Sequence, residues 1–327
     1  MYKMSQKMTR LERTQQYMKK IIKAWHKHYW DFMIENEDPH PDYCWDYGVL
    51  SKNQNVAYEM VLQNDKIPWS SYYLSENPNI TWDIIEKYHV EVWEWCQISK
   101  NPNITWDIIQ QNPDKPWRDR YLSANPNITW DIIQQNPQIE WDGSELSNNP
   151  NISWQIVQDN PQIKWNYFRL SCNPCITWDV VVESQNDDIW NWSTLSYNSN
   201  ITWDIVEANP DKPWDYAYLS VNKNITWDII KQNPNKPWDY NWFLENPNMT
   251  FDMFLNEKEL NLLDCENVCA NNFDLERRNF FVRKCREYMA AYKIQQWWFH
   301  ITMSPHYAIG RKMIDKKLAK VLAEQNE

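Results

Sequence analysis

PWDYAYLSVNKNITWDIIKQN, residues 213–233, is one copy of a motif that recurs along most of the chain. Its ITWDI core is found five times, with the Trp at positions 82, 106, 130, 203 and 227, and near-copies place Trp154 and Trp178 in the same register. Tyr58 and Phe251 continue the register at its two ends. A second aromatic series consists of Trp at 45, 69, 93, 117, 141, 165, 190, 214 and 238, spaced by 24 residues with one step of 25. This regularity predicts a tandem array of nine repeats over residues 41–256.

Each repeat is expected to contain two short helices. In the quoted copy, Thr226 is a suitable cap for the first helix, and Asp228 in the first turn is favoured by the helix dipole. Asn233, a residue that tolerates left-handed backbone, is expected to end this helix. A second helix is predicted to start at Pro237 and to present Trp238 and Phe243 inward before it stops near residue 246.

Helices of about seven residues are not stable alone, because nucleation is costly and support must come from packing. The repeats must therefore stack on one another. We predict an all-α fold: a rod-like or gently superhelical α-solenoid of nine 24-residue, two-helix repeats with helical caps at both ends. The expected organisation is an N-terminal capping helix in residues 1–40, the array in 41–256, and a basic helical region in 257–327.

Positions that recur in every copy are interpreted as structural. Asn is found nine times in nine, at 53, 77, 101, 125, 149, 173, 198, 222 and 246, and Ser precedes it by two residues in eight copies. We predict hydrogen-bond ladders in which these Asn side chains satisfy backbone groups of the neighbouring repeat. The structural positions are typified by Trp82, Trp106, Trp130, Trp203, Trp227, Asn77, Asn101, Asn125 and Asn222. Partner binding is expected instead where copies differ, as at Arg118, Arg120 and Lys164.

Charge is distributed unevenly along the sequence. The net charge is +3 over residues 1–38, −20 over 39–275 and +6 over 276–327. An acidic array would repel a phosphate backbone, so we do not expect it to bind nucleic acid.

The sequence contains no run of 18 apolar residues, so no transmembrane helix is predicted. The first residues do not have the pattern of a signal peptide, so we expect an intracellular protein.

The strings NPNITWDIIQQNPDKPW (101–117) and NKNITWDIIKQNPNKPW (222–238) resemble the Asn- and Trp-rich tandem repeats of proteins encoded by giant, mimivirus-like DNA viruses of amoebae. The resemblance covers about two thirds of the chain. It implies a viral protein located in the host cytoplasm or in the virion.

The C-terminal segment NFFVRKCREYMAAYKIQQWWFH (279–300) resembles an IQ motif at Ile294 and Gln295, followed by Trp297 and Trp298. Such helices bind calmodulin-like proteins, so a partner of this kind is one expectation. His300 stands where that motif has a basic residue, which weakens the resemblance. A structural cap, a protein-binding tail, and a helix for lipid or nucleic acid stay open as alternatives.

The sequence offers no constellation typical of catalysis. None of the six His residues lies in a metal-protease motif, and we find no phosphate loop or nucleophile elbow. Cys172 and Cys175 form a single CxxC pair without a second pair nearby, so neither a metal nor a cofactor is predicted. Our leading hypothesis is a non-enzymatic scaffold that binds an unknown protein partner. The alternatives are a structural virion component and an enzyme with its site in the helical ends.

Overall fold

The computed structural model describes residues 10–36, 45–88, 93–184, 186–253 and 265–303, and in these residues every regular element is a helix. The chain divides into two compact bodies. We call residues 26–276 the repeat body, and residues 1–25 with 277–327 the helical body. Within the described part, no helix is long and apolar enough to span a bilayer.

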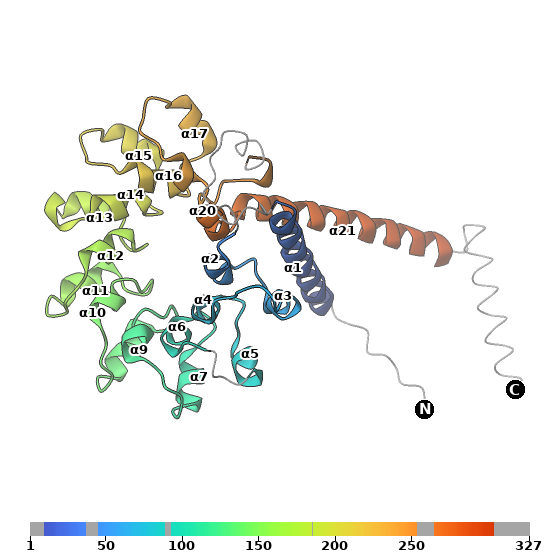
Figure 1. Cartoon of the computed structure of the whole chain (residues 1–327), viewed down its shortest axis with the longest axis horizontal. Helices are drawn as coiled ribbons and strands as arrows, with labels where there is room; N and C mark the ends of the chain where they lie inside the picture. Colours follow the sequence, from blue (N-terminus) through green and yellow to red (C-terminus); the bar gives the residue numbers. More distant parts are fainter. Residues whose placement is uncertain (1–9, 37–44, 89–92, 185, 254–264, 304–327) are drawn as a thin grey trace, which may run out of the picture. The chain divides into compact units, whose positions relative to one another are not determined.

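Two kinds of short helix alternate along the repeat body (Figure 1). The ladder helices are α2 (Tyr47–Ser51), α4 (Ser71–Glu76), α6 (Trp95–Lys100), α8 (Asp119–Leu122), α10 (Gly143–Leu146), α12 (Tyr167–Cys172), α14 (Trp192–Tyr197), α16 (Tyr216–Val221), α18 (Tyr240–Phe243) and α20 (Cys265–Ala270). The tryptophan helices are α3 (Tyr58–Gln63), α5 (Trp82–Lys87), α7 (Trp106–Gln111), α9 (Trp130–Gln135), α11 (Trp154–Asp159), α13 (Trp178–Glu183), α15 (Trp203–Ala208) and α17 (Trp227–Gln232). A 3-10 turn, η1 (Asp187–Ile189), lies in the repeat that is one residue longer.

The tryptophan helix of the quoted copy, α17, begins as predicted and ends differently. The Thr226 hydroxyl accepts a hydrogen bond from the Ile229 N–H at 3.4 Å, and Asp228 lies in the first turn. Asn233, however, has a φ of −125°, so it is not left-handed. Its side-chain amide donates to the Ile229 carbonyl at 2.9 Å, and this bond to a carbonyl of the last turn ends the helix.

The ladder helices start later than predicted. α18 begins at Tyr240 rather than at Pro237, because the Trp238 N–H is bonded to the Lys236 carbonyl at 2.8 Å in a tight turn. Asp239 is the cap and accepts from the Trp242 N–H at 3.0 Å. The expectation that Trp238 and Phe243 face inward is confirmed, since both are buried.

The predicted Asn ladder is present. The Asn125 side-chain amide donates to the Ser99, Asn101 and Ile104 carbonyls of the preceding repeat at 2.8, 3.2 and 3.1 Å. The bond to the carbonyl of the preceding ladder Asn recurs in every copy from Asn77 to Asn246. Ser99 adds a second link, accepting from the Arg118 N–H at 3.0 Å. Rows of buried Leu, Ile and Val fill the space between the ladder and tryptophan helices.

The ladder also closes on itself within the repeat body. Asn271, 25 residues after Asn246, donates to the Leu244 and Asn246 carbonyls. Asn53 in turn donates to the Cys269 and Asn271 carbonyls, each at 2.9 Å. The first and last ladder helices, α2 and α20, are therefore in contact, as Figure 1 shows. The sequence predicted a rod-like or gently superhelical solenoid, and contact between its first and last ladder helices was not part of that prediction.

The end of helix α1 (Arg10–Glu35) supplies a matching tryptophan helix. Residues 30–36 read WDFMIEN, a copy of WDIIKQN at 227–233. The Trp30 and Trp69 rings lie 5.8 Å apart at 34°, the same geometry as Trp82 and Trp117. Asn36 donates to the Phe32 carbonyl at 2.8 Å, as Asn233 does to Ile229. This segment thus resembles the first helix of the repeat in sequence and in contacts.

In the helical body, the first part of α1 packs on α21 (Asp274–Met303). The Tyr17 and Tyr288 rings stack with centroids 3.7 Å apart, and the Trp25 and Phe280 rings meet edge to face at 5.5 Å. The Tyr17 hydroxyl donates to the Lys284 carbonyl at 3.1 Å. The helix predicted over residues 279–300 lies inside α21.

Candidate functional site

The recurring side chains are occupied by contacts between and within repeats. Trp82, Trp106, Trp130, Trp203 and Trp227 each begin a tryptophan helix and are half-buried, and Asn77, Asn101, Asn125 and Asn222 are fully buried in the ladder. The second Trp series donates its indole N–H within the repeat, as Trp117 does to the Asn112 carbonyl at 2.8 Å. A binding site must therefore use other positions.

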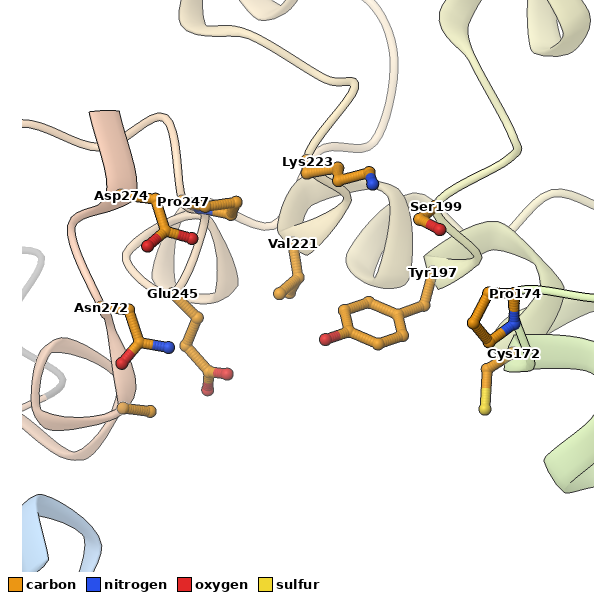
Figure 2. A pocket seen from close by; sticks show the side chains of 11 residues that line it. Cys172, Pro174, Tyr197, Ser199, Val221, Lys223, Glu245, Pro247, Asn272 and Asp274 are labelled. Atoms are coloured by element: carbon orange, nitrogen blue, oxygen red, sulfur yellow. The ribbon is translucent and has the colours of Figure 1, made fainter. Parts of the chain in front are cut away.

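A hollow of about 310 Å³ lies along the side chains that flank the ladder Asn residues. Figure 2 shows its two rows. The residues just before a ladder Asn are Cys172, Tyr197, Val221, Glu245 and Ala270. The residues just after one are Pro174, Ser199, Lys223, Pro247 and Asn272, and Asp274 completes the lining.

The backbone around each ladder Asn explains why its neighbours face the hollow. Asn222 follows the last turn of α16 and has φ −63° and ψ 129°, an extended conformation. Successive side chains in extended backbone point to opposite sides, so burying Asn222 turns Lys223 outward. Because every copy repeats this geometry, the flanking positions form rows along the stack.

Tyr197 is the main aromatic group of the hollow. Its side chain is 49% exposed, so about half of it is buried. This partial burial raises the pKa of the Tyr197 phenol, and the Glu245 carboxylate and the Cys172 thiol add to the shift. Tyr197 is therefore a hydrogen-bond donor at neutral pH.

The predicted partner-binding residues of the array lie outside this hollow. Arg118 is exposed, and its N–H donates to Ser99. Arg120 forms ion pairs with Glu145 at 3.4 Å and with Asp142 at 3.8 Å. Glu145 also holds a bidentate pair with Arg169 at 2.8 and 3.2 Å. Arg120 thus belongs to an ion-pair network that links three consecutive repeats.

The other predicted residues are scattered. Lys164 is exposed and lines a second hollow with Trp154 and Trp165. Ile294 is 64% exposed on α21, in the helical body. Gln295, Trp297 and Trp298 also belong to α21, but their side chains lie outside the described residues. The structure therefore does not gather the predicted residues into one site.

Sequence reasoning missed Tyr197, Ser199, Lys223 and Glu245. The signal was present, because six copies have Pro directly after the ladder Asn (78, 102, 126, 150, 174 and 247). Ser199 and Lys223 replace this Pro in adjacent copies. A comparison of the copies at that position would have selected Ser199 and Lys223, together with Gln54 of the first copy.

In the part of the chain that the structure describes, Cys172 and Cys175 are free thiols, and no three His, Cys, Asp or Glu side chains are grouped to hold a metal ion. Comparison of the chain with protein-family models, with curated proteins and with solved structures finds no match.

Proposed function

We propose that this protein is a non-enzymatic scaffold, built as a closed α-solenoid, that binds a protein partner along the rows flanking the ladder Asn residues. The nine predicted repeats form its continuous part, and the tenth is assembled from residues 30–36 and α20 (Cys265–Ala270). By the resemblance of its repeats, we propose that it is a viral protein acting in the host cytoplasm.

One observation carries the proposal. The recurring side chains are used for stacking, whereas the rows beside the ladder differ from copy to copy and line a hollow. In a repeat protein the stacking positions hold the framework and the variable positions are available for recognition. A catalytic site would instead need a singular group of acid, base or nucleophile side chains.

A photoreactive amino acid at position 221, where Val221 lines the hollow, tests the proposal. The full chain would be expressed in amoebal host cells and irradiated. We expect a discrete covalent adduct with a host or viral protein. The matched control carries the same amino acid at position 107, because Asp107 is exposed on α7 (Trp106–Gln111), away from the hollow. No adduct at 221, or the same adducts at both positions, would overturn the proposal.

A structural role in the virion is the second candidate, and the closed ladder favours it. Each of the ten ladder Asn residues of the described chain donates to one neighbour and accepts from the other, which gives a stiff body. Quantification of the protein in purified particles separates the two roles. Stoichiometric presence there would support the structural role, and absence would support the host factor.

A further inference from the structure

The hollow lies where two adjacent copies depart from the repeat sequence at the position after the ladder Asn. Proline contributes no N–H, so in six copies the position after the ladder Asn has no backbone donor. Ser199 and Lys223 restore a donor in two adjacent copies, and both residues line the hollow. Within the described residues, neither of these N–H groups has a hydrogen-bond partner. The two substitutions therefore add a pair of donors that the stack itself does not use.

Side-chain donors stand beside these two N–H groups. The Ser199 hydroxyl, the Lys223 ammonium and the Tyr197 phenol belong to the same lining, as Figure 2 shows. Lys223 belongs to none of the ion pairs between the described residues. This middle part of the hollow thus presents donors, and a complementary ligand presents acceptors. The carbonyls of an extended peptide are acceptors with a regular spacing.

The end of the hollow nearest α20 presents acceptors and negative charge instead of donors. Glu245, Asn272 and Asp274 lie there, so two carboxylates face the same end (Figure 2). The repeat body as a whole has 15 basic and 39 acidic residues, a net charge of −24. A cationic group is therefore favoured at this end both by the local pair and by the surrounding field.

We propose that the hollow binds an extended peptide segment of a partner protein that carries an arginine side chain. Its backbone carbonyls accept from the Ser199 and Lys223 N–H groups, and the guanidinium pairs with Glu245 and Asp274. Apolar contact comes from Val221, Pro174 and Pro247. This inference rests on the proposed scaffold function and names the chemistry that the partner presents.

The test uses the full chain and two synthetic probes, acetyl-Gly-Arg-Gly-Gly-amide and the same peptide with neutral citrulline in place of Arg. Isothermal titration is expected to show at least tenfold tighter binding of the Arg peptide. Glu245→Gln should reduce this preference to less than threefold. Asp107→Asn, which makes the same change of charge outside the hollow, should leave the preference unchanged. Equal binding of the two peptides to the wild-type chain would overturn the proposal.

The donor pair is tested by restoring the residue that other copies have. The double variant Ser199→Pro, Lys223→Pro matches the repeat at both positions, so it should keep the fold. It is expected to weaken binding of both peptides at least fivefold, whereas Pro126→Ser, outside the hollow, should not. Unchanged binding in the double variant, or binding of inorganic phosphate in preference to either peptide, would refute peptide recognition. If the adduct at position 221 forms while both peptides fail to bind, the scaffold function stands and this inference is wrong.

Discussion

The ladder of Asn side chains is joined in two ways. Between Asn101 and Asn125 the chain is continuous, and the bond spans 24 residues. Between Asn53 and Asn271 the same bond spans 218 residues and joins the two ends of the repeat body. For a flexible chain, the longer closure costs about 2 kcal/mol more. We call the contact between α2 and α20 the seam, and the stacked repeats between Asn77 and Asn246 the interior. The interior already holds the two ends close together, so the seam forms once the interior is stacked. The interior should therefore survive opening of the seam, whereas the seam should not survive damage to the interior.

The largest effect is expected from Asn125→Ala in the interior. Asn125 is fully buried, and its side chain serves three carbonyls and the Asn127 N–H. Since each buried group left without a partner costs about 1–3 kcal/mol, we expect a loss of about 3 kcal/mol or more in the free energy of unfolding. Urea denaturation followed by circular dichroism measures it. A loss below about 1 kcal/mol would contradict the ladder as the main support of the stack.

Asn53→Ala tests the seam and should cost less, about 2 kcal/mol. Asn53 donates to two carbonyls of α20 and its following turn, and its oxygen accepts from the Asn55 N–H at 2.9 Å. Once these bonds are lost, α2 and α20 can separate while the remaining interfaces persist. Amide hydrogen exchange should increase in residues 47–53 and 265–271 and stay slow around Asn125. Equal acceleration in all repeats would show that the seam and the interior unfold together.

Trp30→Ala and Trp82→Ala compare the same kind of aromatic contact at the seam and in the interior. The pairs Trp30–Trp69 and Trp82–Trp117 have the same centroid distance and angle, and both Trp30 and Trp82 are half-buried. Each substitution should lower stability by about 2 kcal/mol, less than for a fully buried Trp because both side chains are only half-buried. Only Trp30→Ala should increase amide hydrogen exchange in residues 47–53 and 265–271, because it loosens the contact between the two ends of the repeat body. Faster exchange there in both variants would show that the two aromatic contacts are equivalent.

Much of the framework follows from comparing copies in the sequence. The recurring Asn predicted the ladder, because identical positions in stacked copies meet identical neighbours. The Thr before the ITWDI Trp caps its helix at Thr105, Thr129 and Thr226 but makes no cap hydrogen bond at Thr81 and Thr202. Closure of the ladder was not predicted. It depends on the angle between adjacent repeats, which accumulates along the stack and is set by packing rather than by any one residue.

Two features of the seam could nevertheless have been found in the sequence. Asn271 follows Asn246 by 25 residues, the same step as from Asn173 to Asn198, and residues 30–36 copy the tryptophan helix. Both were hidden because neither is in step with the 24-residue register. The hollow could not be predicted from the sequence, since only the fold shows that the residues before and after the ladder Asn lie on one surface.

The smallest effect, and the only gain, is expected at Cys175. Other copies have Asn two residues after the ladder Asn, and Asn151 donates there to the Pro126 and Ile128 carbonyls at 2.8 and 3.1 Å. Cys175 keeps the bond from its N–H to the Asn173 side chain but has no amide to donate. Cys175→Asn should bond the Pro150 and Ile152 carbonyls and raise stability by about 1 kcal/mol.

This gain should also depend on pH. Burial raises the pKa of the Cys175 thiol from 9.0 to about 11, so the fold favours the neutral thiol. That contribution is complete below pH 9 and is lost as the pH rises toward 11, because the unfolded chain ionises first. Asn has no such loss, so the stability difference between Cys175→Asn and the wild type should widen over this interval. Urea midpoints for both proteins between pH 8 and pH 10.5 would measure it, and since all other groups titrate in both, they cancel in the difference. A constant difference would mean that the thiol is not buried by the stack, and that this interior position, like the seam, is held less tightly than its neighbours.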